Sequence, residues 1–304
     1  MKKKNNLEKV VVTGGAGFIG SHLVKKLIED GYNVFVIDNL LSGKLENLSP
    51  KAKFFKLDIR NLEEITPVFK DAKYVFHLAA LPSVQYSIEN PMETNEVNVG
   101  GTLNVLTAAR NAGVKRLVYS ASSSVYGDVK RLPIKETEKP APKSPYALQK
   151  YVGELYCKLF NEIYGMETVC LRYFNVYGPG QNPKGTYPNV IANFLELRKQ
   201  NKKLTVVGSG NNTRDYVHVR DVASANILAA TSKKVGKGES INVGTGERHS
   251  INEIAKLIGG PIEFLPPRIE PKDTLADFSL AKLLLNWEPK IDFKKGLKNL
   301  LQNN

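Results

Sequence analysis

Short apolar runs alternate with amphipathic stretches along the first half of the chain. The apolar runs predict strands at residues 10–12, 33–37, 54–57, 74–78, 116–120 and 168–173. The amphipathic stretches predict helices at residues 18–30, 62–70 and 96–111, and a further helix that begins at Ser144. Strands that alternate with helices indicate a parallel sheet with right-handed crossovers. We therefore predict an α/β fold, a Rossmann doubly wound parallel sheet.

The pattern changes after Tyr173. A turn-rich segment is followed by a predicted helix near 189–200, a strand at 204–207, a strand at 214–219 that leads into a helix capped by Asp221, and a last helix at 293–302. We expect residues 1–174 to form the Rossmann domain. Residues 175–304 should form a smaller C-terminal α/β domain over the carboxyl ends of the strands, with segments near 214–232 crossing back to the first domain.

A glycine-rich turn follows the first predicted strand and reads Thr13-Gly-Gly-Ala-Gly-Phe-Ile-Gly20. Glycines permit a tight turn and the close approach of a pyrophosphate to the N-terminus of a helix, where backbone N–H groups favour anions. Asp38 ends the next strand, 21 residues after Gly17. A carboxylate there can accept from the ribose hydroxyls of adenosine and would repel a 2′-phosphate, so the pattern predicts NAD rather than NADP. The alternative is a glycine-rich turn that binds no ligand.

Polar and small residues gather where the predicted strands end. These residues are Gly14, Asp38, Asp58, Ala79, Ser120–Ser123 and Tyr173. Ligands of doubly wound sheets bind at that edge. Tyr146 and Lys150 are four residues apart on the helix that follows, so they share one face. A phenol ionises near pKa ~10 and an adjacent ammonium lowers that pKa, so the pair can act as an acid–base device. The alternative is an ordinary amphipathic helix with an exposed Tyr and Lys.

Composition narrows the class of protein. The chain has 304 residues and a net charge of +13, which would suit a nucleic acid or a nucleotide diphosphate, but the lysines are scattered and favour a solvated surface. No run approaches ~18 apolar residues, so we expect no membrane span. The four histidines are scattered, and we expect no metal site. Cys157 and Cys170 have no metal spacing and are interpreted as reduced thiols of a cytoplasmic protein.

Several motifs together resemble the extended short-chain dehydrogenase/reductase superfamily, and within it the UDP-hexose 4-epimerases. The motifs are the glycine turn, Asp38-Asn39, Asp58-Ile59, His77-Leu-Ala-Ala80, Asn98, Ser120-Ala-Ser-Ser-Ser-Val-Tyr-Gly127, Ser144-Pro-Tyr-Ala-Leu-Gln-Lys150, Leu171-Arg-Tyr-Phe-Asn-Val-Tyr-Gly-Pro179 and Arg214-Asp-Tyr-Val-His-Val219. The resemblance covers nearly the whole chain. It is closest to UDP-N-acetylglucosamine and UDP-glucose 4-epimerases.

The resemblance implies a role for three catalytic residues. Tyr146 would be the base that takes the 4-hydroxyl proton of a UDP-sugar, Ser122 would hydrogen-bond the sugar 4-oxygen, and Lys150 would hold the nicotinamide ribose of the cofactor NAD. It also implies a homodimer, paired through helices at about 96–111 and 146–164.

The resemblance further implies two sets of binding residues. The cofactor contacts would be Gly14, Gly17, Phe18, Ile19, Gly20, Asp38, Asn39, Leu40, Ser42, Gly43, Asp58, Ile59, Leu78, Ala79, Ala80, Asn98, Ser120, Tyr146, Lys150 and Tyr173. The substrate contacts would be Ser83, Ser122, Ser123, Tyr146, Asn175, Asn189, Val190, Thr205, Val207, Arg214, Glu270 and Thr274. The guanidinium of Arg214 suits a diphosphate independently, because it binds such oxygens in a bidentate manner.

The sequence differs from related families at two places, and other functions remain as alternatives. The run Arg268-Ile-Glu-Pro-Lys-Asp273 differs from the family's Arg-Pro-Gly-Asp-like run. Ser122-Ser123-Ser124 lacks the Asp-Glu pair of sugar 4,6-dehydratases and the glutamate of UDP-glucuronate decarboxylases. A uronate 4-epimerase or another NAD-dependent nucleotide-sugar enzyme, and a non-catalytic NAD-binding protein, are the alternative functions.

Thr274 falls where the family has a residue that gates the 2-substituent of the sugar. A large aromatic residue at that place excludes an N-acetyl group and a small one admits it. The resemblance therefore implies that both N-acetylated and plain UDP-hexoses are substrates.

Overall fold

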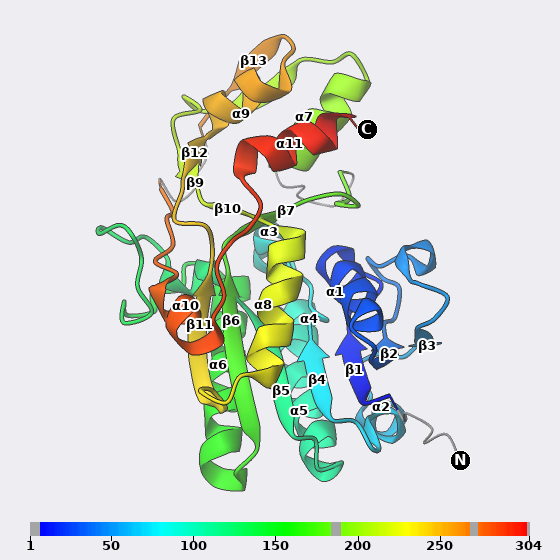
Figure 1. Ribbon diagram of the computed structural model, residues 1–304. Helices are drawn as coiled ribbons and strands as arrows, with labels where there is room; N and C mark the ends of the chain where they lie inside the picture. The colour runs from blue at the N-terminus through cyan, green and yellow to red at the C-terminus, as the bar shows by residue number, and fades with distance from the viewer. Residues whose placement is uncertain (1–6, 184–189, 268–272, 303–304) are drawn as a thin grey trace.

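A seven-stranded parallel sheet forms the centre of the molecule, and its strands are joined in the order β11-β6-β5-β4-β1-β2-β3 (Figure 1). The strands are β1 (Lys9–Thr13), β2 (Asn33–Ile37), β3 (Lys53–Phe55), β4 (Tyr74–His77), β5 (Arg116–Ser122), β6 (Glu167–Tyr173) and β11 (Lys237–Val243). The computed structural model describes residues 7–183, 190–267 and 273–302. The chain reverses direction across the sheet between β1 and β4, the place where doubly wound folds bind ligands. The predicted fold class is confirmed.

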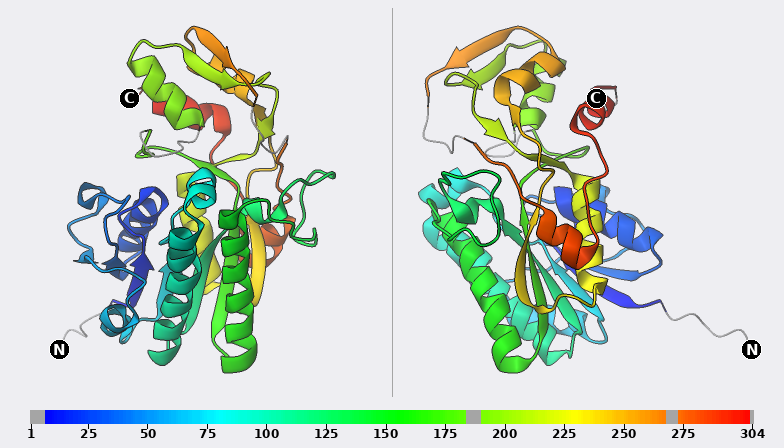
Figure 2. Two further views of the ribbon diagram at one scale, coloured as in Figure 1. Left: turned by 180° about the vertical axis from the view of Figure 1, so that it is seen from behind. Right: turned by 60° about the vertical axis from the view of Figure 1, so that its left-hand side comes forward.

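Helices cover both faces of the sheet (Figure 2). One face carries α1 (Phe18–Glu29), α8 (Val219–Thr231) and α10 (Ser279–Leu285), and the other carries α2 (Leu62–Phe69), α5 (Thr102–Asn111) and α6 (Pro145–Tyr164). Alternate residues of a strand point to opposite faces. Val10 and Val12 accordingly pack on the first face and Val11 on the second, and all three are fully buried. Strands buried on both faces explain the uninterrupted apolar run that predicted β1.

A smaller part of the chain lies above the carboxyl ends of the strands (Figure 1). It contains α7 (Val190–Lys199), α9 (Ile251–Ile258) and α11 (Phe293–Gln302), with the strand pairs β7 (Asn175–Tyr177) and β10 (Tyr216–His218), β9 (Thr213–Arg214) and β12 (His249–Ser250), and β8 (Leu204–Val207) and β13 (Ile262–Leu265). Its helices enclose a separate apolar cluster. The chain returns from this part to the sheet through α8 and β11. The predicted domain boundary at residue 174 stays a prediction.

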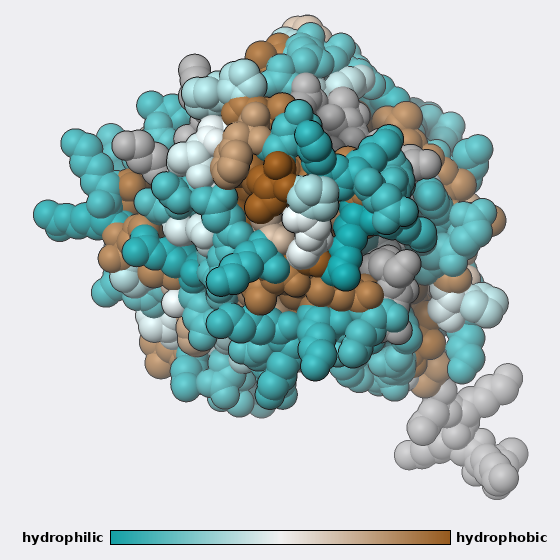
Figure 3. All heavy atoms as spheres, turned by 90° about the horizontal axis from the view of Figure 1, so that it is seen from above, coloured by the Kyte–Doolittle hydropathy of each residue, from teal (hydrophilic) through white to brown (hydrophobic). Residues whose placement is uncertain are grey.

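Mainly hydrophilic residues cover the molecule where it is seen from above, with small apolar areas among them (Figure 3). Within residues 7–183, 190–267 and 273–302, no helix is long and apolar enough to cross a membrane.

The sequence predicts one regular helix at 96–111, but the structure has a π-helix followed by an α-helix there. Glu96–Gly101 form a π-helix (η2) that α4 (Pro91–Asn95) precedes and α5 continues. Thr102 Oγ1 donates to Asn98 O at 2.6 Å inside this wider turn. A Cβ atom on Gly101 would lie 2.5 Å from the Ile59 side chain, so the glycine lets η2 approach that residue. A π-turn inside a helix is often found at a functional site.

The residue that caps α8 is also not the one that the sequence predicted. His218, not Asp221, is the N-cap, and its Nδ1 accepts from the backbone N–H of Arg220 at 3.2 Å. The carboxylate of Asp221 accepts instead from the backbone N–H of Ile291 at 3.0 Å. The predicted strand at 214–219 is divided into β9 and β10, with Asp215 between them.

Candidate active site

A cavity of about 250 Å³ lies at the carboxyl ends of the central strands. Its walls come from the glycine turn after β1, the segments that follow β2, β3 and β4, the end of β5, the start of α6 and the end of β6. The topology therefore brings together the strand ends that carried the polar residues in the sequence.

The glycines of the turn let the chain pass close to neighbouring backbone and leave the start of α1 open. Gly14 has φ +72°, and a Cβ atom there would lie 2.6 Å from the backbone N of Ala79. Gly17 is the N-cap of α1, where no side chain caps the helix and no acidic residue lies in the first turn. The N–H groups at this end remain suited to an anion. These residues fit the diphosphate of a dinucleotide.

Asp38 fixes the loop that faces this turn. Asp38 is 8% exposed, and its carboxylate accepts from the backbone N–H groups of Ala16 at 3.0 Å and Leu40 at 2.8 Å. The first bond ties Asp38 to the glycine turn, and the second stabilises a loop in which Leu40 has φ +63°. The acid that the sequence places near an adenosine ribose is thus held at the wall of the cavity.

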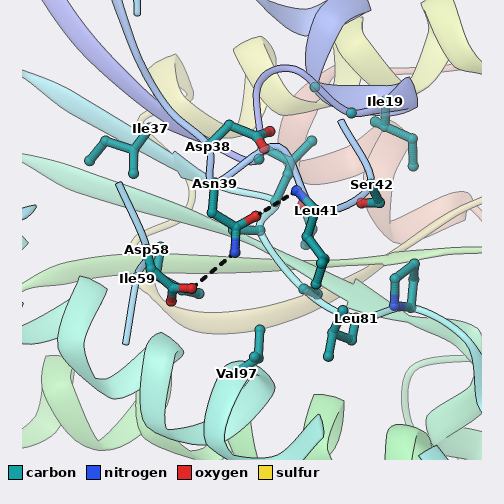
Figure 4. A pocket seen from close by; sticks show the side chains of 18 of the residues that line it. Ile19, Ile37, Asp38, Asn39, Leu41, Ser42, Asp58, Ile59, Leu81 and Val97 are labelled. Atoms are coloured by element: carbon teal, nitrogen blue, oxygen red, sulfur yellow. Dashed lines mark hydrogen bonds between the residues drawn. The ribbon is translucent and has the colours of Figure 1, made fainter. Parts of the chain in front are cut away.

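Asp58 closes the same end of the cavity from the next strand. Asn39 Nδ2 donates to Asp58 Oδ2 at 3.0 Å, and Ile59 and Val97 lie nearby in the wall of the cavity (Figure 4). Arg60 donates to both oxygens of Asp58, at 3.0 and 2.8 Å, and these hydrogen bonds are the main cause that lowers the pKa of Asp58 to about 2. Asp58 is therefore an ionised acceptor at neutral pH.

Tyr146 lies in the first turn of α6, at the other end of the cavity. Ser144 caps this helix by accepting from the N–H of Ala147 at 3.2 Å, and Ser87 Oγ accepts from the N–H of Tyr146 at 3.0 Å. These two serines fix where the phenol enters the site.

Burial controls the ionisation of that phenol. It raises the pKa of Tyr146 to about 12, while a hydrogen bond with Ser122 acts to lower it. Ser122 Oγ in turn accepts from the N–H of Ser124 at 3.2 Å and from its hydroxyl at 2.9 Å, which leaves the Ser122 proton for the phenol oxygen. From the sequence we expected the ammonium of Lys150 to lower the pKa of Tyr146. In the structure this pKa is raised instead, because burial outweighs the effects that stabilise the phenolate.

Lys150 is 4% exposed and lines the cavity one helical turn after Tyr146. Its Nζ donates to the carbonyl oxygen of Ser120 at 2.8 Å and lies 5.0 Å from the centre of the Tyr119 ring. Burial lowers the pKa of Lys150 to about 8. An amphipathic helix with an exposed Tyr and Lys is excluded by these positions.

Tyr173 extends the polar wall at the end of β6. Its hydroxyl donates to Asn226 Oδ1 at 2.9 Å and lies 2.9 Å from Ser120 Oγ, which then acts as the donor to Tyr173. Burial raises the pKa of Tyr173 to about 12, so it is a neutral phenol at physiological pH.

Most residues of the predicted cofactor set line the cavity. They are Gly14, Gly17, Phe18, Ile19, Gly20, Asp38, Asn39, Ser42, Asp58, Ile59, Leu78, Ala79, Ala80, Ser120, Tyr146, Lys150 and Tyr173. Leu40, Gly43 and Asn98 are not among the lining residues. Asn98 is buried and bonds the backbone of Leu81 and the side chain of Gln149, so it fixes the cavity wall from behind. The binding roles of all these residues stay predictions.

The predicted substrate residues are spread over the upper part of the molecule. Ser83 caps α3 (Val84–Glu89), Ser122 and Ser123 lie where β5 meets the 3₁₀ turn η3 (Ser123–Tyr126), and Asn175 begins β7. Val190 lies on α7, Thr205 and Val207 on β8, Arg214 on β9, and Thr274 in the segment that follows β13. Asn189, Glu270 and Arg268 lie outside the described residues.

Sequence reasoning missed several lining residues. These are Ile37, Leu41, Leu57, Arg60, Leu81, Pro82, Glu93, Val97 and Ala121. Most are neighbours of a residue that was predicted, so their proximity to a strand end was the available signal. Glu93 and Val97 come from α4 and η2, whose path over the cavity no local pattern predicts.

Other candidate chemistry lies outside the cavity. Cys157 and Cys170 are buried and not in disulfides. In the described part of the chain, no group of three or more His, Cys, Asp or Glu side chains could hold a metal ion.

Comparison with known proteins identifies relatives over the full length. A model described as the NAD dependent epimerase/dehydratase family matches residues 10–244. The structure of a UDP-glucose 4-epimerase from Thermotoga maritima with UDP-glucose is 41% identical, covers 97% of each chain and has a TM-score of 0.92. A UDP-N-acetylglucosamine 4-epimerase from Methanobrevibacter ruminantium, in complex with UDP-N-acetylmuramic acid, is 38% identical over 97% of each chain, with a TM-score of 0.93.

A third structure contains the cofactor. The UDP-glucose 4-epimerase of Thermus thermophilus, in complex with NAD, is 38% identical, covers 97% of this chain and 98% of its own, and has a TM-score of 0.89.

Proposed function

The chain belongs to the NAD dependent epimerase/dehydratase family, and from this premise we propose that it is an isomerase, an NAD-dependent UDP-sugar 4-epimerase. We infer two pairs of substrates, UDP-N-acetylglucosamine with UDP-N-acetylgalactosamine and UDP-glucose with UDP-galactose. The similar structures support this choice, because one is named for the plain sugar and another for the N-acetylated one.

One observation carries the proposal: Tyr146 and Lys150 line the same cavity as the glycine turn and Asp38. A dinucleotide whose diphosphate lies at the glycine turn and whose adenosine lies at Asp38 would extend toward Tyr146. Its nicotinamide end would then meet a sugar whose C-4 hydroxyl contacts Tyr146 and Ser122.

The proposed chemistry assigns one task to each polar side chain. Bound NAD supplies reversible hydride acceptance at C-4 of the sugar. Tyr146 would take the 4-hydroxyl proton as the hydride leaves C-4, and the loss of both gives a 4-keto sugar. Ser122 would donate a hydrogen bond to the sugar 4-oxygen. Lys150 holds the nicotinamide ribose and favours the phenolate by its charge. After the keto sugar turns in the site, the hydride would return to the other face of C-4 while Tyr146 returns the proton to the 4-oxygen, which gives the other epimer.

The serine run favours epimerisation over the neighbouring reactions. Elimination and decarboxylation in related enzymes use carboxylates at this place, whereas here Ser122 and Ser124 hydrogen-bond each other at 2.9 Å. A uronate 4-epimerase needs the same three catalytic residues and stays the second candidate.

Product analysis tests the function. Purified protein is incubated separately with UDP-glucose, UDP-galactose, their N-acetyl forms and UDP-glucuronate, and the nucleotide sugars are separated. We expect 4-epimers from the first four. Conversion of UDP-glucuronate alone would support the uronate enzyme, and no conversion of any sugar would support a non-catalytic NAD-binding protein.

Replacement of Asp38 by Ser should weaken the preference for NAD. The carboxylate repels a 2′-phosphate and accepts from the Ala16 N–H, so its loss should reduce discrimination against NADP by about 10-fold or more. The measurement is the coenzyme released from denatured protein and the affinity of the apoprotein for each dinucleotide. Asp30→Ser, at the far end of α1, is the control and should change neither the coenzyme that is released nor the affinity for each dinucleotide. Wild-type protein that releases mainly NADP would contradict the assignment.

We propose a homodimer that pairs through α6 and the neighbouring helix α5. Four aliphatic side chains of α6 are exposed: Leu148 at 51%, Leu155 and Leu159 at 44%, and Ile163 at 64%. The last three are four residues apart and lie along one face of the helix. A partner helix would remove this stripe from water.

Leu159→Glu should therefore give a monomer, because the charge would be buried at the partner helix. Light scattering of the variant and of the wild type measures the change. Leu283→Glu, at a still more exposed site on α10 (62%), should leave the dimer intact. A wild-type monomer at working concentration would refute the pairing.

We also propose a cytoplasmic location. Cys157 and Cys170 are not in disulfides, and disulfide formation is typical of oxidising compartments.

A further inference from the structure

We propose that Asp215 is a positioning residue that holds three parts of the substrate wall in register, those that carry Asn175, Arg214 and Thr274. The inference rests on the proposed function, because the resemblance alone assigns those three residues to the substrate. Asp215 itself is fully buried between β9 and β10 and touches no substrate in this assignment.

Four hydrogen bonds converge on the Asp215 carboxylate. Oδ1 accepts from the N–H and the hydroxyl of Thr245, each at 2.8 Å. Oδ2 accepts from the N–H of Gly246 at 2.9 Å and from the N–H of Ala276 at 3.0 Å. The donors lie about 30 and 61 residues away along the chain, so a single side chain joins three separate segments.

This arrangement suits an ionised carboxylate, because all four partners from the chain are donors. Burial raises the pKa of Asp215, and the hydrogen bonds from Thr245, Ala276 and Gly246 oppose that rise. Hydrogen bonds to a charged acceptor are stronger than those between neutral groups. Gly244 makes room for the contact, because a Cβ atom there would lie 3.0 Å from Asp215 Oδ2 and 2.5 Å from the Ala276 side chain.

The backbone of Asp215 holds the other segments. Its carbonyl oxygen accepts from the N–H of Asn175 at 3.0 Å, and Arg214 precedes it in the chain. Its own N–H donates to Thr274 Oγ1 at 3.4 Å. Thr274 is held a second time, because its N–H donates to Thr213 O at 3.1 Å. Asp215 thus contacts or adjoins each of the three substrate residues.

Asp221 offers a matched control of the same chemical type. It is also a buried carboxylate, 4% exposed, and it also fixes a distant backbone, that of Ile291 at 3.0 Å. Burial raises its pKa too. The segment that it holds contains no residue of the predicted substrate set.

The experiment compares Asp215→Asn with Asp221→Asn. The amide keeps the size of the side chain but removes the charge and turns a donor toward N–H groups that need an acceptor. For Asp215→Asn we expect KM for UDP-sugars to rise about 10-fold or more, kcat to change less than about threefold, and the ratio of N-acetylated to plain activity to change. For Asp221→Asn we expect a lowered unfolding temperature with KM unchanged. NAD content should stay at the wild-type level in both.

Two results would overturn the inference. One is an unchanged KM in folded Asp215→Asn, and the other is an equal change of KM in both variants, which would indicate a general loss of packing. If Asp215→Asn does not fold, Thr245→Val replaces it: this variant removes one donor to Oδ1 and should raise KM by about 2- to 5-fold. An unchanged KM in Thr245→Val would then refute the inference.

Binding of UDP distinguishes a failure of the proposed function from a failure of the positioning role of Asp215. If the wild type epimerises no UDP-sugar, calorimetry with UDP measures the same site without turnover. Weaker UDP binding by Asp215→Asn than by the wild type would still support the positioning role. Equal binding, or no binding of UDP by the wild type, would refute it.

Discussion

Replacement of Tyr146 by Phe is expected to lower kcat by about 10²-fold or more while the fold and the NAD content stay unchanged. The ring stays in place, but the atom that takes the proton is lost. The N–H of Tyr146 keeps its bond to Ser87, so the start of α6 should be unaffected. Steady-state turnover of UDP-sugars and the unfolding temperature together measure the outcome.

The pH dependence supplies a second readout of the same residue. The active form of a base is the deprotonated one, so activity should rise with pH toward the phenol pKa. Burial raises that pKa to about 12, and the positive charge of the nicotinamide should bring it down when NAD binds. The rise in activity should disappear in Tyr146→Phe.

Tyr151→Phe, on the same helix, is the matched control and should retain wild-type turnover. Near wild-type turnover in Tyr146→Phe would show that another group is the base.

Replacement of Thr274 by Tyr is expected to abolish the N-acetylated activity selectively. An acetamido group needs space for several heavy atoms, and forcing it against a phenol ring costs overpacking strain of ~1–3 kcal/mol or more. That strain corresponds to a loss of roughly 10- to 100-fold in kcat/KM for the N-acetylated substrates. Activity on UDP-glucose and UDP-galactose should survive, and the ratio of the two activities measures the effect.

The structure refines the expectation at Thr274. Its hydroxyl accepts from the N–H of Asp215 at 3.4 Å, so this oxygen already has a partner in the chain. We expect the small size of Thr274 to be the property that would admit the acetyl group. Thr231→Tyr, at the exposed end of α8, is the control and should change neither activity. If Thr274→Tyr loses both activities equally, or loses neither, the residue that gates the 2-substituent lies elsewhere.

The local order of strand, glycine turn, helix, strand and acid was readable from the sequence because each part depends on its own residues. The strand at Asn33–Ile37 and the helix at Phe293–Gln302 have the predicted bounds. Gly14 combines a φ of +72° with a position where a Cβ atom would lie 2.6 Å from the backbone N of Ala79, so it favours glycine. Apolar strands buried on both faces give continuous runs. Parallel strands then bring their carboxyl ends to one edge, which is why most of the predicted cofactor residues line the cavity.

Tertiary structure alone decided what depends on contacts between distant segments. No pattern near Tyr146 reveals a phenol whose pKa is about 12, because burial by other segments sets that value. No local signal makes His218 the cap of α8, or predicts the π-helix that passes over the cavity. The donors to the Asp215 carboxylate come from loops about 30 and 61 residues away, and only the folded chain brings them to one buried charge.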